Sequence, residues 1–490
     1  MVWWNKRRTA SGLPTLVIGA GDAGRELVRA LLAAPDYGLT PVAVLDDDAR
    51  IRRVHSLPVI GGLGDLRSAV ARTGAKAAVI AIPSLPPARI AELIHEGTAC
   101  GLLVRYLPSF LAAVERDMRV SDLRGVRIDE LLGRAEVHVA SEATRSLVRG
   151  RRVLVTGAGG SIGSELCRQI ASFQPQALYL LDHDESNLHG LHLDLSGSGL
   201  LDNDEIIVAD IRDQPRLEKI FDATRPEIVL HAAAHKHLPL LERHPCEAVK
   251  TNVLGTEHLV DLAVRYGSER FVLISTDKAA DPTSVLGATK RLAELVVQAA
   301  ADGPTRMASV RFGNVLGSRG SFLHVLADQV AKGRAVTITH PEVTRFFMTV
   351  EEAVGLVLEA MTMADAGEIF VLDMGEPVAI VDLVRKYAAA VNVPDVKIEF
   401  TGLRRGEKLN EKVFSESEVR IETPHPKIWA TQRGDIPIDL APQLKELYAA
   451  AAENDDERTI DLLRRMLPDY VPAGDAFSPA QLAAPYPDGF

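Results

Sequence analysis

A hydroxyl, a carboxylic acid and an amine follow one another in this sequence as Thr276, Asp277 and Lys278. The apolar run 271–274 predicts a buried strand before them, and the residues after Lys290 have the apolar spacing of a helix. Because ligands bind at the carboxyl ends of strands in open α/β sheets, we expect these groups to line a binding site. Adjacent acid and amine side chains suit acid–base catalysis. Residues of these types also commonly cap helices, which is the alternative interpretation.

A glycine-rich loop upstream predicts a dinucleotide site. The predicted strand 151–155 leads into the loop Thr156–Gly163, and a predicted helix follows at once. Asp182 ends the next predicted strand about 20 residues later, where a carboxylate binds ribose hydroxyls and repels a 2′-phosphate, so we expect NAD rather than NADP. The expected cofactor contacts are Gly157, Gly160, Ser161, Ile162, Gly163, Asp182, Asp210, Ile211 and Ala232.

A second glycine-rich loop lies near the start of the chain. The predicted strand 14–18 leads into Gly19, Gly21 and Gly24, and the next predicted strand ends at Asp46. This order of strand, glycines and helix is typical of a nucleotide site, because the backbone can approach a pyrophosphate at the helix N-terminus. We interpret this part as a nucleotide-binding or regulatory domain, with a purely structural role as the alternative.

Composition disfavours several classes of protein. The chain has 490 residues and a formal net charge of -11 at pH 7, whereas nucleic-acid binding needs a basic face. Cys100, Cys167 and Cys246 match neither a disulfide framework nor a metal site, and they suit a reducing cytoplasm. No window approaches the roughly 18 consecutive apolar residues of a membrane span. The tryptophans and basic residues of segment 3–8 could contact the inner face of a membrane, and a frayed terminus is the alternative.

The predicted elements indicate an α/β protein with two Rossmann-like, doubly wound parallel sheets. We expect an N-terminal domain over residues 1–117, a linker over 118–150 and a catalytic domain over 151–430. Its small C-terminal substrate-binding subdomain begins at about residue 311. Residues 431–490 are expected to form helices and a loose tail.

Several motifs together resemble the CapD-like nucleotide-sugar 4,6-dehydratases of the extended short-chain dehydrogenase/reductase superfamily. These motifs are Thr156–Gly163, Asp182, His231–Pro239, Ser275–Lys290, Arg311–Ser321, Thr344–Thr349 and Gly402–Lys408. The resemblance covers nearly the whole chain. It implies NAD as cofactor, UDP-N-acetylglucosamine as substrate, a homo-oligomer and a role in polysaccharide biosynthesis. Two departures are the missing N-terminal transmembrane helices and Leu286, which stands where the superfamily has a proton-exchanging tyrosine.

The resemblance also implies roles for individual residues. Lys278, if its pKa is lowered, would remove the sugar C5 proton, and Asp277, if protonated, would donate to the leaving 6-hydroxyl. Thr276 would share the proton traffic, and Lys290 would bind the nicotinamide ribose. The expected substrate contacts are His235, Lys236, Arg311, Asn314, Arg319, Arg404 and Glu407.

Two other functions stay open at this point. A UDP-sugar 4-epimerase of the same superfamily also cycles NAD, but it relies on the tyrosine that Leu286 replaces and needs no adjacent acid and base. A non-catalytic regulator that binds NAD or a UDP-sugar would explain Leu286 directly. Against it, Asp277, Lys278 and Lys290 are all present.

Overall fold

The structure of the protein is a computed structural model. It describes residues 12–33, 39–48, 50–82, 85, 89–90, 92–93, 96–97, 100–106, 124–125, 140–201, 203–316, 318, 322–390, 393, 395–431, 434 and 436–472. The segment 3–8, Arg319 and most of the C-terminal tail lie outside these residues. Within the described part, no helix has both the length and the apolar character needed to cross a membrane.

The chain divides into two compact units, of which the first contains the N-terminal sheet. Its five strands are ordered β2-β1-β5-β6-β7, parallel except for the last pair. The elements are β1 (Leu13–Ile18), α1 (Asp22–Ala33), β2 (Leu39–Leu45), β3 (Arg53–Val54), β4 (Leu57–Pro58), η2 (Leu63–Asp65), α2 (Leu66–Thr73), β5 (Ala77–Ile80), β6 (Leu103–Tyr106) and β7 (Arg124–Gly125). Strand β1 is buried over its last four residues, as expected for a central strand of a parallel sheet.

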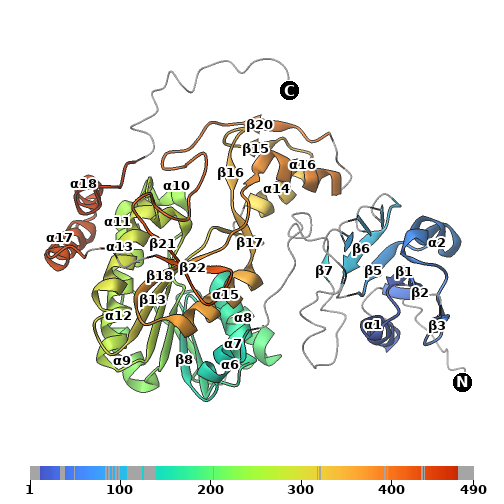
Figure 1. The fold of residues 1–490 in the computed structure, drawn as a ribbon, viewed down its shortest axis with the longest axis horizontal. Coiled ribbons are helices and arrows are strands. Elements are labelled where there is room, and N and C mark those ends of the chain that lie inside the picture. Colours follow the sequence, from blue (N-terminus) through green and yellow to red (C-terminus); the bar gives the residue numbers. More distant parts are fainter. Residues whose placement is uncertain are drawn as a thin grey trace, which may run out of the picture. The chain divides into compact units, whose positions relative to one another are not determined.

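The second unit contains a nine-stranded sheet of order β10-β9-β8-β11-β12-β13-β18-β22-β21 (Figure 1). Its strands are β8 (Arg152–Thr156), β9 (Ala177–Asp182), β10 (Ile206–Val208), β11 (Ile228–His231), β12 (Arg270–Ile274), β13 (Arg306–Arg311), β18 (Ala366–Leu372), β21 (Arg420–Glu422) and β22 (Ile428–Thr431). The first seven in this order are parallel, and β22 and β21 are antiparallel. The expected α/β class with parallel sheets is confirmed. The strand order reverses between β8 and β11, where such sheets bind ligands.

Helices cover both faces of this sheet. The helices of the second unit are α6 (Glu142–Val148), α7 (Ser161–Ala171), α8 (Glu185–Ser196), α9 (Gln214–Thr224), α10 (Leu238–Leu241), α11 (Pro245–Ala248), α12 (Gly255–Arg265), α13 (Val285–Ala299), α15 (Val350–Met363), α17 (Leu440–Ala452) and α18 (Asp456–Met466). Buried residues of α9, α12 and α13 form one hydrophobic cluster with the sheet. Residues of α6, α7 and α15 form the cluster on the other face.

Shorter elements complete the chain. They are the π-helix η4 (Val249–Leu254), the 3-10 helix η5 (Asp277–Ala279), β14 (Asn314–Leu316), α14 (Phe322–Ala331), β15 (Val336–Ile338), β16 (Thr344–Arg345), β17 (Phe347–Thr349), β19 (Val378–Ala379), α16 (Ile380–Ala390) and β20 (Ile398–Phe400). Strand β14 pairs with β17, and β16 pairs with β19.

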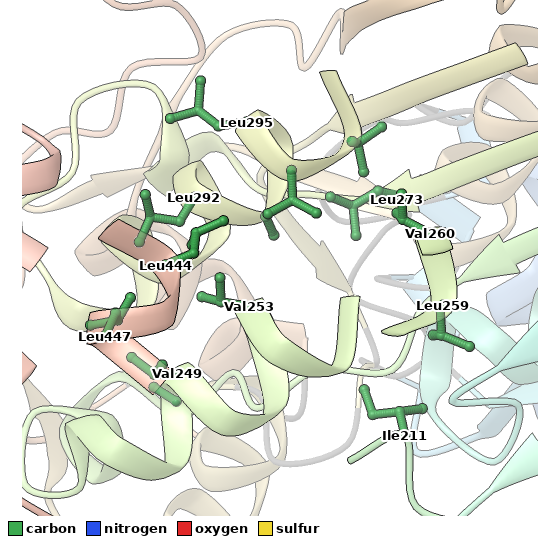
Figure 2. Packing of buried hydrophobic residues seen from close by; sticks show 14 of the residues in the cluster. Ile211, Val249, Val253, Leu259, Val260, Leu273, Leu292, Leu295, Leu444 and Leu447 are labelled. Carbon is green, nitrogen blue, oxygen red and sulfur yellow. The ribbon is translucent and has the colours of Figure 1, made fainter. Parts of the chain in front are cut away.

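The two C-terminal helices belong to the core of the second unit. Leu444 and Leu447 of α17 lie beside Val249, Val253 and Leu292 in the packed cluster of Figure 2. Leu447 is fully buried, so α17 covers apolar surface of η4 and α13. Burying a leucine side chain contributes about 1.5 to 3 kcal/mol. Helix α13, which carries Lys290, therefore packs against the sheet on one side and against the C-terminal helix α17 on another.

The end of the expected linker is helical and is attached to the second unit. Ser141 caps α6 by accepting a hydrogen bond from the Thr144 amide. The Ser141 amide and hydroxyl both donate to the Glu359 carboxylate of α15, at 2.6 and 2.8 Å. The end of the expected linker, from residue 140 onward, is thus held against α15 of the second unit.

Candidate active site

A cavity of about 720 Å³ opens at the carboxyl ends of the central strands of the second unit. Its walls come from the loops after β8, β9, β10, β11, β12 and β13 and from the start of α13. This size is ordinary for a ligand or cofactor site. The position of the cavity agrees with the prediction from the sequence, because Thr276, Lys278 and Lys290 all line its wall.

The glycine-rich loop leaves no space for side chains where a dinucleotide would lie. Gly157 has φ +68°, and a Cβ there would meet the Ala233 amide nitrogen at 2.5 Å. A Cβ on Gly163 would lie 2.0 Å from the Gly157 carbonyl oxygen. The loop is therefore tight, and it aims the N-terminus of α7 at the cavity. These features fit a pyrophosphate held by backbone amides.

Asp182 supports the loop and faces the cavity. Its Oδ2 accepts a hydrogen bond from the Gly159 amide at 2.9 Å, and its Oδ1 accepts one from the Asp184 amide at 3.0 Å. Asp182 stays at the cavity wall together with Asp210, Ile211 and Ala232.

Arg212 stands beside Asp210 at the same end of the cavity. Its guanidinium donates to Asp210 Oδ2 at 2.6 Å and to Glu247 Oε2 at 2.9 Å. Burial raises the pKa of Asp210, but hydrogen bonds from Arg212 outweigh it and hold that pKa below its usual range. The Arg212 guanidinium therefore offsets the negative charges of Asp210 and Glu247 at this end of the cavity.

The histidines of the β11 loop have different roles. His231 is buried, and burial together with the Lys290 charge lowers its pKa to about 3. Its neutral ring bridges the hydroxyls of Thr156, at 2.8 Å, and Thr256, at 2.9 Å, so it ties β8 and β11 to α12. His235 and Lys236 lie at the cavity wall instead.

Asn252 positions this loop from the π-helix η4. Its Oδ1 accepts a hydrogen bond from the His235 amide at 2.8 Å, and its Nδ2 donates to the His235 carbonyl at 3.1 Å. The same Nδ2 donates to Thr289 Oγ1 at 3.2 Å, next to Lys290. A residue that sequence reasoning did not single out thus links the β11 loop to α13. π-helical turns are frequent at functional sites, and this one carries Asn252.

The expected acid–base group is assembled at the carboxyl end of β12. Lys278 Nζ lies 3.0 Å from Asp277 Oδ1, and Thr276 Oγ1 donates to the same oxygen at 2.9 Å. The Asp277 side chain is 1% exposed, and its Oδ2 has no hydrogen-bond partner among the described residues. Glu411 adds a second carboxylate, with Oε1 3.4 Å from Lys278 Nζ.

The two lysines of the site are in opposite electrostatic environments. Burial lowers the pKa of Lys278, but the carboxylates of Asp277 and Glu411 outweigh burial, so this pKa lies above its ordinary value. Lys290 is buried without such a pair, and burial lowers its pKa to about 8 despite the nearby Glu294 charge. The condition that Lys278 has a lowered pKa is therefore not met in this structure, and Lys278 is an ammonium paired with carboxylates.

Leu286 and Lys290 lie one helical turn apart on α13 and both reach the cavity wall. Ser284 caps this helix by accepting a hydrogen bond from the Gly287 amide at 3.1 Å. Leu286 is 6% exposed and carries no proton-exchanging group. Leu286 therefore cannot take the part of the superfamily's tyrosine in proton transfer.

Comparisons with known proteins show the family of the chain. The sequence profile of the family described as "Polysaccharide biosynthesis protein" matches residues 153–433. The chain belongs to this family. It is 42% identical to the probable polysaccharide biosynthesis protein EpsC of Bacillus subtilis, over 88% of this chain and 74% of EpsC. It is 40% identical to the capsular polysaccharide biosynthesis protein CapD of Staphylococcus aureus, over 85% of this chain and 71% of CapD.

More distant relatives of the chain include a nucleotide-sugar dehydratase and a protein of known structure. The UDP-N-acetylglucosamine 4,6-dehydratase (inverting) of Campylobacter jejuni is 30% identical over 56% of this chain and 80% of its own length. The solved structure of Pen from Bacillus thuringiensis is 30% identical, with a TM-score of 0.54 over 60% of this chain and 90% of Pen. The similarity to Pen supports the Rossmann-type fold of the catalytic sheet.

The structure does not bring Arg311 of this family member to the cavity. Its side chain is 0% exposed, and its guanidinium forms two hydrogen bonds with the Glu294 carboxylate, both at 2.7 Å. A third bond of 2.7 Å reaches Glu418 Oε2. Glu294 also accepts from Ser275 Oγ at 2.6 Å. Arg311 thus ties β13 to α13 inside the unit and does not line the cavity where the expected substrate contact would be made.

The remaining predicted substrate residues separate into two groups. Asn314 lies at the cavity wall with His235 and Lys236. Arg404 and Glu407 belong to a loop outside the residues that line it. Glu407 Oε1 accepts hydrogen bonds from Thr339 Oγ1 and from the Arg345 guanidinium, both at 2.9 Å. This carboxylate therefore holds the loop to β16, and its expected substrate contact stays a prediction.

The first unit repeats one feature of the catalytic glycine loop. Asp46 Oδ2 accepts a hydrogen bond from the Ala20 amide at 2.6 Å, as Asp182 does from Gly159. Gly19 has φ +113°, and a Cβ on Gly24 would lie 2.0 Å from the Gly19 carbonyl oxygen. Gly21, at the start of the helix, has open space around it. A nucleotide ligand for this loop stays a prediction.

Proposed function

We propose that this protein catalyses the NAD-dependent 4,6-dehydration of a UDP-sugar. The substrate would be UDP-N-acetylglucosamine and the product a UDP-4-keto-6-deoxy-N-acetylhexosamine for polysaccharide or glycan synthesis. The observation that carries this proposal is the contact of Asp277 Oδ1 with Lys278, which lines the same cavity as the aliphatic Leu286. An elimination needs a base and an acid close together, and the relative in Campylobacter jejuni is named for this reaction.

The chain has the residues to hold NAD. Gly157, Gly160 and Gly163 form a loop that suits the pyrophosphate, and Asp182 suits a ribose. Lys290 reaches the same cavity from α13. When bound, NAD supplies the hydride chemistry at the sugar, so that no net oxidation results.

The Asp277–Lys278 pair can supply both proton-transfer groups from one shared proton. Transfer of that proton from Lys278 Nζ to Asp277 Oδ1, across 3.0 Å, leaves a neutral amine and a carboxylic acid. The amine can then take the C5 proton, and the acid can protonate the departing 6-hydroxyl. A bound substrate that excludes water favours this neutral form, because ions lose solvation in a dry site. Thr276 Oγ1 orients the carboxyl group by donating to it.

The rest of the cavity wall suits a nucleotide diphosphate sugar. Lys236 offers a positive charge on the β11 loop, and Asn314 offers an amide that can donate and accept hydrogen bonds. His235 is held at the same edge by Asn252, and burial lowers its pKa below the ordinary value. His235 can therefore approach an anionic ligand as a neutral donor.

Proton NMR of the purified protein with UDP-N-acetylglucosamine, without added reductant, tests the proposal. We expect a new 6-methyl doublet together with a 4-keto or hydrated 4-keto product. Formation of UDP-N-acetylgalactosamine would instead identify a 4-epimerase. Absence of any new sugar signal from protein that retains NAD would contradict the proposed substrate.

A variant of Lys278 tests the assignment of roles. Lys278→Ala should abolish product while leaving UDP binding within about threefold, because the acid–base pair is lost and the glycine loop is untouched. Lys219→Ala, which removes an exposed lysine on α9, is the control and should keep wild-type turnover. Near-normal turnover of Lys278→Ala would show that another group removes the C5 proton.

A further inference from the structure

Glu411 contacts the acid–base group from a distant part of the chain. Its side chain is 3% exposed, and its Oε1 lies 3.4 Å from Lys278 Nζ. Its other oxygen, Oε2, has no hydrogen-bond partner among the residues that the structure describes. Lys408 Nζ lies 4.0 Å from Oε2, beyond hydrogen-bond distance. A buried carboxylate with a free oxygen is costly, so its position beside Lys278 calls for a function.

Backbone contacts fix the loop that carries Glu411. The Leu409 carbonyl accepts hydrogen bonds from the Thr344 amide and from the Arg345 guanidinium of β16, both at 3.1 Å. The Gly406 carbonyl accepts one from Thr283 Oγ1, just before α13, at 3.2 Å. The loop is thus tied to β16 and to the start of α13.

Gly406 permits the close approach of this loop to α13. It has φ +77°, and a Cβ there would lie 2.8 Å from both Glu242 Oε1 and Ser284 Cβ. Glu242 accepts a hydrogen bond from the Val285 amide at 2.7 Å, at the first residue of α13. The loop therefore passes directly over the N-terminus of the helix that carries Lys290. These anchors hold the backbone that carries Glu411 independently of its ion pair with Lys278.

Charged groups face Lys278 from three elements. Asp277 belongs to its own 3-10 helix, and Glu411 reaches it from the loop. Arg345 of β16 and Lys408 of the loop add positive charge near the cluster, and Asp281 adds negative charge near Lys408. The two carboxylates dominate, and the pKa of Lys278 lies above its ordinary value.

We propose that Glu411 is a positioning residue of the active site, which fixes Lys278 Nζ beside the cavity and sets the pH range in which Lys278 can act as a base. This inference rests on the proposed function, since it concerns the base of the same reaction. A lysine side chain has a flexible four-carbon stem. Asp277 anchors Nζ from the neighbouring residue, and Glu411 anchors it from across the cluster.

The pH dependence of turnover carries the test. The proposed mechanism needs the Asp277–Lys278 pair with its one shared proton, so kcat is expected to fall as pH rises through the pKa at which Lys278 loses that proton. Glu411 stabilises the ammonium form, so its removal should lower that pKa. In Glu411→Gln this falling limb should move to lower pH by about one unit or more, as expected for losing an opposite charge within 4 to 6 Å. The glutamine side chain has nearly the same size, and Glu411 does not line the cavity, so KM should change by less than about threefold.

Glu416→Gln is the matched control. It removes a carboxylate from the same loop, but this carboxylate is 87% exposed and pairs with Lys412 rather than with Lys278. The falling limb should keep its wild-type pH in this variant. A falling limb that is unchanged in Glu411→Gln, or that moves equally in both variants, would overturn the role of Glu411.

A second readout does not depend on turnover. Competitive labelling of Lys278 with acetic anhydride across a pH series, followed by mass spectrometry, reports its pKa in the absence of substrate. We expect labelling to begin at lower pH in Glu411→Gln than in wild type. Glu411→Asp keeps the charge but withdraws it by one methylene, so it should shift the onset in the same direction by less. This variant tests the inference should the glutamine variant fail to fold.

The proposed function and this inference fail in different ways. A wild-type protein that forms no 4-keto-6-deoxy sugar contradicts the proposed function, whatever the labelling shows. A wild-type protein that forms this product, with identical Lys278 labelling in wild type and Glu411→Gln, contradicts the inference alone.

Discussion

Replacing Arg311 by methionine separates a structural role from a substrate-binding role at one position. The change removes a fully buried guanidinium and leaves the Glu294 carboxylate, also 0% exposed, with Ser275 and Arg291 as its remaining partners. Breaking a buried ion pair by removing one partner costs about 3 to 5 kcal/mol. Arg291 lies 3.1 Å from Glu294 and compensates in part, so we expect a loss near the lower value.

Thermal unfolding and steady-state kinetics should be measured on the same preparations. A loss of about 3 kcal/mol corresponds to a Tm lowered by about 6 °C, at about 2 °C per kcal/mol for a domain of this size. The KM for the sugar nucleotide should stay within about threefold, because Arg311 does not line the cavity. The variant Arg311→Met/Glu294→Leu removes both charges and should recover most of the stability, since apolar replacement of a buried pair is often neutral.

The reverse pattern would refute this reasoning. If Arg311→Met kept the wild-type Tm and raised KM more than tenfold, Arg311 would contact the sugar diphosphate in the working enzyme. If the double variant were less stable than Arg311→Met, the buried charges would not be the source of the loss.

Two further predictions concern the cofactor loop and Lys290. Gly163→Ala places a Cβ 2.0 Å from a carbonyl oxygen and should weaken NAD binding by on the order of tenfold, measured by calorimetry. Gly190→Ala, in open space on α8, should instead stabilise the protein by up to about 1 kcal/mol. The pKa of Lys290 is lowered to about 8 when folded and rises towards 10.5 when unfolded. Between these two pKa values the unfolded state therefore binds more protons than the folded state. The free energy of unfolding is then expected to increase as pH rises. Urea unfolding should show this rise in wild type and not in Lys290→Met.

Local sequence patterns predicted the parts of the site that depend on one strand and the loop after it. The glycine loop follows β8, Asp182 ends β9, and Thr276 to Lys278 follow β12, as strand periodicity and loop composition indicated. Carboxyl ends of parallel strands meet at one edge of a sheet, so their side chains reach one cavity. The prediction of a parallel α/β fold, which rests on the same local patterns, is also confirmed.

Arg311 shows where local patterns are insufficient. The motif around it suggested a substrate contact, but Arg311 is the last residue of β13, and alternate residues of a strand share a face. Met307 packs in the cluster with α12 and α13, whereas Ala308 packs on the opposite face. Arg311 has the parity of Met307 and so points towards Glu294 of α13. Strand parity could have found this, but the partner on α13 could not be inferred from spacing alone.

Glu411 had no sequence signal for its place beside Lys278. The two residues come together because Gly406 lets the loop approach α13, and because β16 anchors Leu409. Such contacts depend on tertiary packing and not on the periodicity of either segment. The Asn252 bridge between η4, the β11 loop and α13 is of the same kind.

The buried charges of the site bear on whether it can catalyse a reaction with Leu286 in place of the superfamily's tyrosine. Asp277 and Glu411 are 1% and 3% exposed, and one oxygen of each has no hydrogen-bond partner among the described residues. Burying an ion costs several kcal/mol, and an unsatisfied polar atom costs about 1 to 3 kcal/mol. Binding NAD or a sugar nucleotide does not need such groups, since the glycine loop and Asp182 suffice for the cofactor. Ionisable groups in costly environments cluster at sites of proton transfer. Because Leu286 cannot exchange a proton, the proposed elimination assigns the proton transfers to this cluster, and a function in binding alone would leave its cost unexplained.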